Sequence, residues 1–119
     1  MLADGWSFDT DFPGATGDGL GQATHLRDIY VRADPKVTTR ATVPILWDKE
    51  TDTIVSNESS EIIRMFNTAF NEVTGNTLDF YPEPLRAEID ALNDRIYDSF
   101  NNGVYRSGFA RSQEAYDDA

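Results

Sequence analysis

Apolar side chains recur at helical spacing in the middle of the chain. From Glu58 to Phe70 they lie three and four positions apart, which predicts a helix with one apolar face. The residues of that face are Ile62, Met65, Phe66, Ala69 and Phe70. Glu58 and Glu61 fall in the first turn, where the helix dipole favours acidic side chains. Gly75 is expected to end the helical region.

A second amphipathic helix is predicted from Leu85 to about Asn101, after a linker at 76–84 in which two prolines, Pro84 among them, hold the chain extended. Its apolar stripe consists of Leu85, Ile89, Leu92, Ile96 and Phe100. Gly103 suits the left-handed residue that commonly follows a helix C-cap, so this helix is expected to close there. Residues 104–119 are predicted to begin a third helix.

The first half of the chain predicts smaller elements. Residues 4–24 are rich in glycine and predict loops, except at Gly5–Phe8, where the alternation is typical of a strand end. Residues 24–33 predict a short helix, with Thr24 as the N-cap and Asp34-Pro35 as the stop.

Residues 41–56 predict a β-hairpin, with a polar turn at 49–52 and a returning strand at 53–56. Pro44 lacks the N–H that a central strand needs, so it belongs at the strand entry, where the Val43–Pro44 bond is a candidate cis peptide. Short β elements followed by helices indicate a small α/β layer joined to an all-α part.

The charge balance narrows the choice of partners. The chain has 21 acidic and 10 basic residues and a formal net charge of -11. A field of this sign repels nucleic-acid backbones and anionic membrane surfaces, so neither is expected as a partner. Acidic residues spread along a chain that has only two lysines, Lys36 and Lys49, also suggest adaptation to high salt, and we hypothesise a halophilic source.

Cysteine is absent and histidine occurs once, at position 25, so neither a thiolate nor a histidine metal site is expected and no metal cofactor is predicted. No apolar run approaches 18 residues and no signal-like segment opens the sequence, which favours a cytoplasmic protein. His25 and the acidic pair Asp117-Asp118 are assigned no chemistry.

Four segments carry a resemblance to a known family: Gly5–Phe8, Thr42–Asp48, Asn57–Ile62 and the Asn-Asn-Gly-Val-Tyr-Arg-Ser-Gly-Phe-Ala run at 101–110. Val-Pro followed by Glu-Ser is shared by many glutathione transferases, and the run at 101–110 is far more specific. Over almost its whole length the chain resembles the Xi-class glutathione transferases, the glutathionyl-hydroquinone reductases.

The resemblance implies a fold of the α/β plus all-α class. Residues 1–75 would form a partial thioredoxin-like, glutathione-binding domain without its first strand and helix. Residues 76–84 would be the linker, and 85–119 the truncated start of the C-terminal helical domain. On this interpretation the chain is an internal fragment of a longer enzyme, and the family suggests a homodimer.

The resemblance also implies a reaction. An active-site cysteine in a Cys-Pro-Trp-Ala type motif attacks the thioether of a glutathionyl-hydroquinone, and a second glutathione resolves the mixed disulfide. The products are hydroquinone and oxidised glutathione. Such exchange needs a thiolate, and this chain has no cysteine, so none of its residues is predicted to be the nucleophile. The alternatives are a non-catalytic γ-glutamyl-thiol-binding or interaction module and a decayed gene product.

The family's Glu-Ser pair corresponds to Glu58 and Ser59. In the family this pair binds a γ-glutamyl group, so the resemblance implies such a binding site here. Glu58 would pair with the ammonium, while Ser59 and the free N–H groups of the helix start would bind the carboxylate. Any γ-glutamyl thiol would suit these groups, so glutathione or a relative is the expected substrate. The alternative is helix capping by Asn57 or Ser59.

Three further positions match family residues. Val43, before Pro44, would offer its backbone N–H and C=O to the cysteinyl part of the thiol; the alternative is an ordinary hairpin strand with an edge proline. Trp6 would lie beside the thiol or, alternatively, plug the core. Tyr105 would bind the phenolic oxygen of the quinone-derived substrate or, alternatively, pack between helices. Arg40 is more consistent with a solvated side chain than with a ligand contact.

Overall fold

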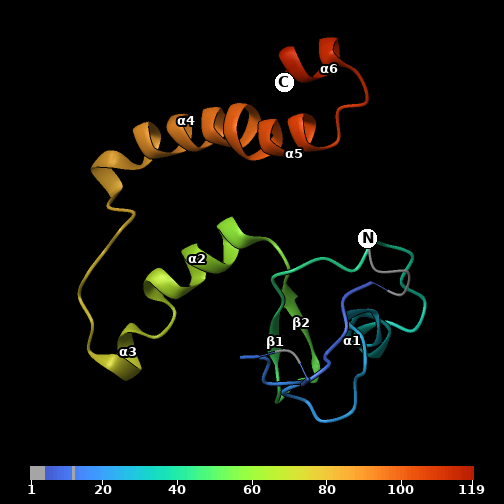
Figure 1. Cartoon of the computed structure of the whole chain (residues 1–119). Coiled ribbons are helices and arrows are strands. Elements are labelled where there is room, and N and C mark those ends of the chain that lie inside the picture. Colours follow the sequence, from blue (N-terminus) through green and yellow to red (C-terminus); the bar gives the residue numbers. More distant parts are fainter. Residues whose placement is uncertain (1–4, 12) are drawn as a thin grey trace. The chain divides into compact units, whose positions relative to one another are not determined.

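The computed structural model describes residues 5–11 and 13–119, and it divides into two compact units, Met1–Phe66 and Asn67–Ala119 (Figure 1). Asp4, where the sequence predicts the first loop to begin, lies outside the described residues. The thioredoxin-like and helical domain limits at residues 75 and 85 stay a prediction.

The β-hairpin of the first unit confirms the sequence prediction. Strands β1 (Leu46–Asp48) and β2 (Thr53–Ser56) pair antiparallel, and Trp47 lies opposite Ile54. The ladder begins only at Leu46, with an irregularity before Trp47. Pro44 therefore lies before the strand, and the Val43–Pro44 peptide is cis, as predicted.

Helix α1 (Leu26–Ala33) supplies most of the core of this unit and contacts β2. Leu26, Ile29 and Tyr30 are buried because their spacing of three and four residues puts them on one face. Ile62 of α2 (Ser59–Thr68) is buried as well. Burying such an apolar side chain contributes about 1.5–3 kcal/mol, so these four residues form the apolar core of the described part of the unit.

The start of α1 corrects one prediction. His25, not Thr24, is the N-cap residue, and Asp28 does the capping: its carboxylate accepts the backbone N–H groups of Thr24 and His25 at 3.0 and 2.9 Å. The hydrogen bond from His25 is the first cause that holds the pKa of Asp28 below 3.8. The predicted stop is confirmed, because Asp34 is the C-cap and donates its N–H to Tyr30.

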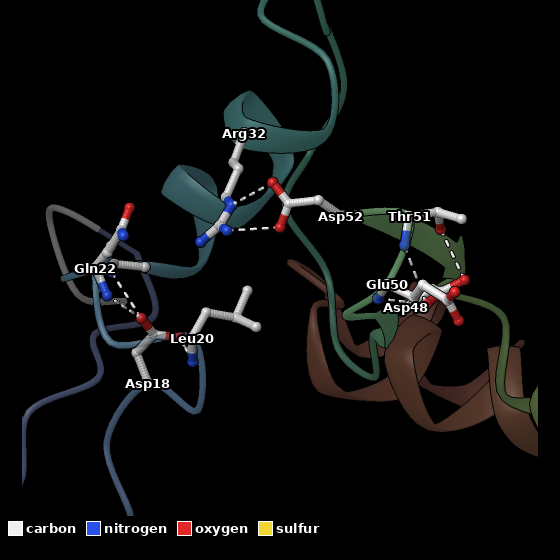
Figure 2. Close-up of polar contacts among 9 residues, drawn as sticks. Asp18, Leu20, Gln22, Arg32, Asp48, Glu50, Thr51 and Asp52 are labelled. Atoms are coloured by element: carbon white, nitrogen blue, oxygen red, sulfur yellow. Dashed lines mark hydrogen bonds and ion pairs between the residues drawn. The ribbon is translucent and has the colours of Figure 1, made fainter.

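Charged side chains tie α1 to the hairpin turn. Arg32 binds both carboxylate oxygens of Asp52, at 2.5 and 3.1 Å (Figure 2). Its guanidinium also lies 5.5 Å from the ring centroid of Trp47. Asp18 organises the loop before α1, because its carboxylate accepts the backbone N–H groups of Leu20, Gln22 and Ala23. The bond from Ala23 is the first cause of the lowered pKa of Asp18. Arg32 lowers the pKa of Asp18 further by its charge.

The second unit is helical. It contains α3 (Asn71–Thr74), a 3-10 turn (Glu83–Leu85), α4 (Arg86–Ile96), a π turn (Tyr97–Asn101), α5 (Asn102–Gly108) and α6 (Gln113–Asp117). Gly75 follows α3 with a φ of 68°, so the predicted end of that helical region is confirmed. In the part of the chain that the structure describes, no helix is long and apolar enough to cross a bilayer.

The helix predicted at 58–70 is confirmed as α2, which ends at Thr68, and the short helix α3 continues the helical region to Gly75. Two predictions about the second unit were wrong. Pro84 lies inside the 3-10 turn and not in an extended linker, since proline suits the first positions of a helical turn. The helix from residue 86 does not close at 101 but continues through the π turn and α5 to Gly108, so only α6 is a separate third helix.

Gly103 explains why that helix was expected to stop. The residue is buried within α5, and its φ is not positive. A Cβ there would lie 3.4 Å from the backbone oxygen of Ala119, which is an ordinary contact, so neither a positive φ nor a steric limit requires glycine at this position. A glycine is found within helices as well as at left-handed C-caps, and local sequence does not separate the two.

Candidate functional site

The predicted ligand side chains at the start of α2 make no recorded hydrogen bond within the described part of the chain. The hydroxyl of the buried Ser56 accepts the N–H of Glu58 at 3.1 Å and donates to the carboxylate of Glu61 at 2.9 Å. Ser56 therefore caps the N–H of Glu58, the residue before α2, and the capping alternatives of Asn57 and Ser59 stay predictions. Glu58 and Ser59 are exposed, and among the described residues neither side chain makes a recorded hydrogen bond.

Val43 and Pro44 lie in an exposed segment that leads into β1. The side chain of Val43 is 54% exposed, and the residue precedes the paired strand by three positions. Its backbone N–H and C=O have no recorded partner within residues 5–11 and 13–119. Val43 therefore lies outside the paired strand, and its backbone contact with a ligand stays a prediction.

A hydrogen-bonded cluster of Tyr30, Thr42 and Asn57, which we term the Tyr30 cluster, joins these two segments. The Tyr30 hydroxyl donates to the carbonyl oxygen of Thr42 at 3.0 Å and accepts the N–H of Thr42 at 3.2 Å. The Asn57 amide donates to the Tyr30 hydroxyl at 3.0 Å and to the Thr42 hydroxyl at 3.1 Å. Since Thr42 precedes Val43 and Asn57 precedes Glu58, the cluster brings both predicted ligand segments together.

Trp6 is hydrogen-bonded to the start of α1, the helix that carries Tyr30. Its carbonyl oxygen accepts the N–H of Leu26 at 2.9 Å, and the next residue, Ser7, forms an isolated antiparallel bridge with His25. This pairing accounts for the strand-like alternation of that segment. The side chain of Trp6 is 60% exposed, so its alternative role as a core plug is wrong.

Tyr105 lies on α5, in the second unit. Its ring is 66% exposed and stacks on Phe109, with ring centroids 6.4 Å apart. The alternative of a tyrosine packed between helices is therefore not seen within this unit. Arg40, in the first unit, is exposed, in agreement with the solvated side chain expected for it.

Two other features do not belong to the predicted site. A hollow of about 500 Å³ is lined by Ser60, Glu61, Arg64 and Met65, but neither Glu58 nor Ser59 lines it. Among the residues with described positions, no group of His, Asp and Glu side chains is arranged to hold a metal ion.

The Tyr30 cluster was missed by the sequence analysis. Tyr30 and Thr42 are 12 positions apart, and Tyr30 and Asn57 are 27 apart, so no local pattern connects them. The one available signal was a tyrosine on the buried face of a short helix, because a buried tyrosine hydroxyl usually finds a hydrogen-bond partner.

No protein-family model matches the chain, but individual proteins do. Over 119 residues it is 60% identical to the glutathionyl-hydroquinone reductase YqjG of Escherichia coli, and over 121 residues it is 50% identical to the glutathionyl-hydroquinone reductase PcpF of Sphingobium chlorophenolicum. Each match takes in 100% of this chain.

Solved structures agree. Glutathione-bound YqjG matches with a TM-score of 0.93 and 59% identity over 99% of this chain and 38% of that chain. Glutathione transferase Xi 1 of Trametes versicolor matches with a TM-score of 0.92 and 56% identity over 100% of this chain and 42% of that chain. The chain spans only 36% of the length of YqjG and 38% of PcpF in the sequence comparison. The predicted fold class is confirmed, for a part of the fold.

Proposed function

We propose that this chain, which is homologous to a part of the glutathionyl-hydroquinone reductases and other Xi-class glutathione transferases, carries the γ-glutamyl-thiol site of such an enzyme. The observation that supports the proposal is the start of α2. Ser56 accepts the N–H of Glu58 and donates to Glu61, and no hydrogen bond of the Glu58 and Ser59 side chains is recorded among the described residues, so these side chains and the first helical N–H groups are offered to a ligand.

Each proposed contact follows from ordinary chemistry. The γ-glutamyl carboxylate would accept hydrogen bonds from the Ser59 hydroxyl and the first N–H groups of α2, at the positive end of the helix dipole. Glu58 would pair with the ammonium. The backbone of Val43, before Pro44, would pair with the cysteinyl residue as one strand pairs with another. Trp6 would cover the thiol from the side.

The reaction we propose for the whole enzyme is the reduction of glutathionyl-hydroquinones. A cysteine thiolate attacks the glutathionyl sulfur, the carbon–sulfur bond breaks, and the ring carbon takes a proton. A second glutathione thiolate then attacks the mixed disulfide, which regenerates the cysteine and forms oxidised glutathione. The 119 residues contain no cysteine, so their role is to bind and orient, with Tyr105 contacting the phenolic oxygen.

The proposal also covers the location, the partners and the assembly of the protein. We place the protein in the cytoplasm, with a small thiol and a quinone-derived molecule as its partners and a homodimer as its assembly. The net charge of -11 argues against nucleic acid and anionic membranes as partners. We also attribute the acidic surface to a high-salt source. A chain that folds fully, with unchanged stability, in the absence of added salt would contradict that origin.

A glutathione titration followed by heteronuclear NMR tests the site. We expect shifts confined to Trp6, Val43, Glu58 and Ser59, and a Glu58→Gln variant should bind about three- to tenfold more weakly, because it loses one exposed charge pair. Glu88→Gln is the matched control, since Glu88 is an exposed acid in the second unit. Dispersed spectra without any shift would refute the proposed thiol site and favour a folded module with another role.

A further inference from the structure

We infer that Tyr30 is a positioning residue of the thiol site, and that its hydroxyl sets the direction in which the Val43 N–H meets the ligand. The inference rests on the proposed function and adds a residue that touches no ligand. It starts from the Tyr30 cluster, whose three members come from α1, from the segment before β1 and from the segment before α2.

The first step is the capacity of the Tyr30 hydroxyl. A tyrosine hydroxyl has one proton to donate and two lone pairs to accept with. The proton goes to the Thr42 carbonyl oxygen, and the lone pairs receive the Thr42 N–H and the Asn57 amide. The side chain is 7% exposed and its hydroxyl is saturated, so Tyr30 does not bind a ligand itself.

The second step is the peptide plane between Thr42 and Val43. The Thr42 carbonyl and the Val43 N–H belong to one planar group, and in a trans peptide they point in opposite directions. Among the described peptides only Val43–Pro44 is cis, so the Thr42–Val43 peptide is trans. A hydrogen bond that fixes the Thr42 carbonyl therefore also fixes the Val43 N–H, which points away from the cluster.

The third step is the register between the two ligand segments. Asn57 donates to both Tyr30 and Thr42, and it immediately precedes Glu58. The same side chain therefore holds the Val43 peptide at a set place relative to the start of α2. A ligand that spans both segments gains affinity from such preorganisation, because it does not have to order them on binding.

Three variants test the inference by NMR titration of the whole chain with glutathione. Tyr30→Phe removes the hydroxyl and keeps the buried ring. Asn57→Asp replaces the amide donor by an acceptor that competes with Thr42 for the Tyr30 proton, at a position closer to the surface. Thr42→Val removes only the side-chain hydroxyl and leaves both backbone bonds to Tyr30. Tyr116→Phe, which removes the hydroxyl of an exposed tyrosine in α6, is the matched control.

We expect Tyr30→Phe and Asn57→Asp to bind glutathione about tenfold more weakly, the loss typical of one misplaced hydrogen bond. At saturation with glutathione, the Val43 amide should no longer change its chemical shift, while the Ser59 amide still does. General destabilisation would not produce this difference between the two amides. Tyr116→Phe should bind as the native chain does. Thr42→Val, which loses the bond from Asn57 but keeps both backbone bonds to Tyr30, should bind more weakly than the native chain while the Val43 amide still shifts on binding. If Tyr30→Phe fails to fold, Asn57→Asp decides.

Two results would overturn the inference, and they are distinguishable. A native chain that binds glutathione together with variants of unchanged affinity and unchanged Val43 response would refute the role of Tyr30 and leave the proposed function intact. A native chain that binds no glutathione would refute the proposed function, and the inference with it.

Discussion

Two serines three positions apart allow the proposed ligand role to be separated from helix capping. Ser56 is 7% exposed, and its hydroxyl bonds the Glu58 N–H and the Glu61 carboxylate. Ser59 is exposed and makes no recorded side-chain hydrogen bond within the described part of the chain. Replacing each by alanine should therefore affect different properties of the protein.

Ser56→Ala should lower the free energy of unfolding by about 1–2 kcal/mol. The loss of a capping hydroxyl costs about 1 kcal/mol, and the bond to Glu61 adds less than a buried charged bond would, because Glu61 is exposed to water. Ser59→Ala should change the free energy by no more than about 0.5 kcal/mol, as surface substitutions do. Its glutathione affinity should instead fall about three- to tenfold, for one lost hydrogen bond.

The assay is urea unfolding followed by circular dichroism, with amide exchange of α2 to localise the effect and NMR titration for affinity. Ser60→Ala is a suitable control, because Ser60 is an exposed neighbour in the same first turn. If Ser59→Ala destabilised α2 as much as Ser56→Ala and left glutathione binding unchanged, Ser59 would be a cap and the proposed carboxylate site would be wrong.

Three further predictions follow from local geometry. Gly103→Ala should raise the free energy of unfolding, measured by urea unfolding, by up to about 1 kcal/mol. Alanine favours a helix more than glycine does, and its Cβ would meet only an ordinary contact at 3.4 Å. A lower stability would contradict the helical conformation of this residue. Hydrogen bonds hold the pKa of Asp28 below 3.8 in the folded chain, so its contribution to stability is complete above pH 3.8 and is lost as the pH falls through the folded value. Asp28→Asn should therefore reduce the fall of the urea unfolding midpoint at acid pH. An unchanged pH dependence of the midpoint would contradict the capping role. The chain should self-associate, because the helices at 86–108 expose large apolar side chains, namely Leu92, Tyr97, Phe100, Val104 and Tyr105. Light scattering measures this, and a monodisperse monomer would contradict it.

Elements set by local patterns were predictable from the sequence. The hairpin followed from a β-branched run, a polar turn and a proline that excludes a central strand. The predicted helix stop at Asp34 followed from the proline behind it. Choices between equivalent local signals were not predictable. Helix α1 has both Thr24 and His25 before it, and the capping was decided by Asp28, whose carboxylate reaches both backbone N–H groups.

The same limit applies to the candidate site, where the sequence Ser-Asn-Glu-Ser-Ser at 56–60 offers several residues that cap helices well. Propensity ranks asparagine with serine, so it does not select between Asn57 and Ser56. The amide nitrogen of Asn57 donates to Tyr30 and Thr42, both distant in sequence, so these tertiary contacts orient its side chain. The hydroxyl of Ser56 accepts the N–H of Glu58 and also reaches Glu61. These contacts leave the side chains of Glu58 and Ser59 without a recorded hydrogen bond among the described residues, and local sequence alone does not separate the proposed ligand role of these residues from helix capping.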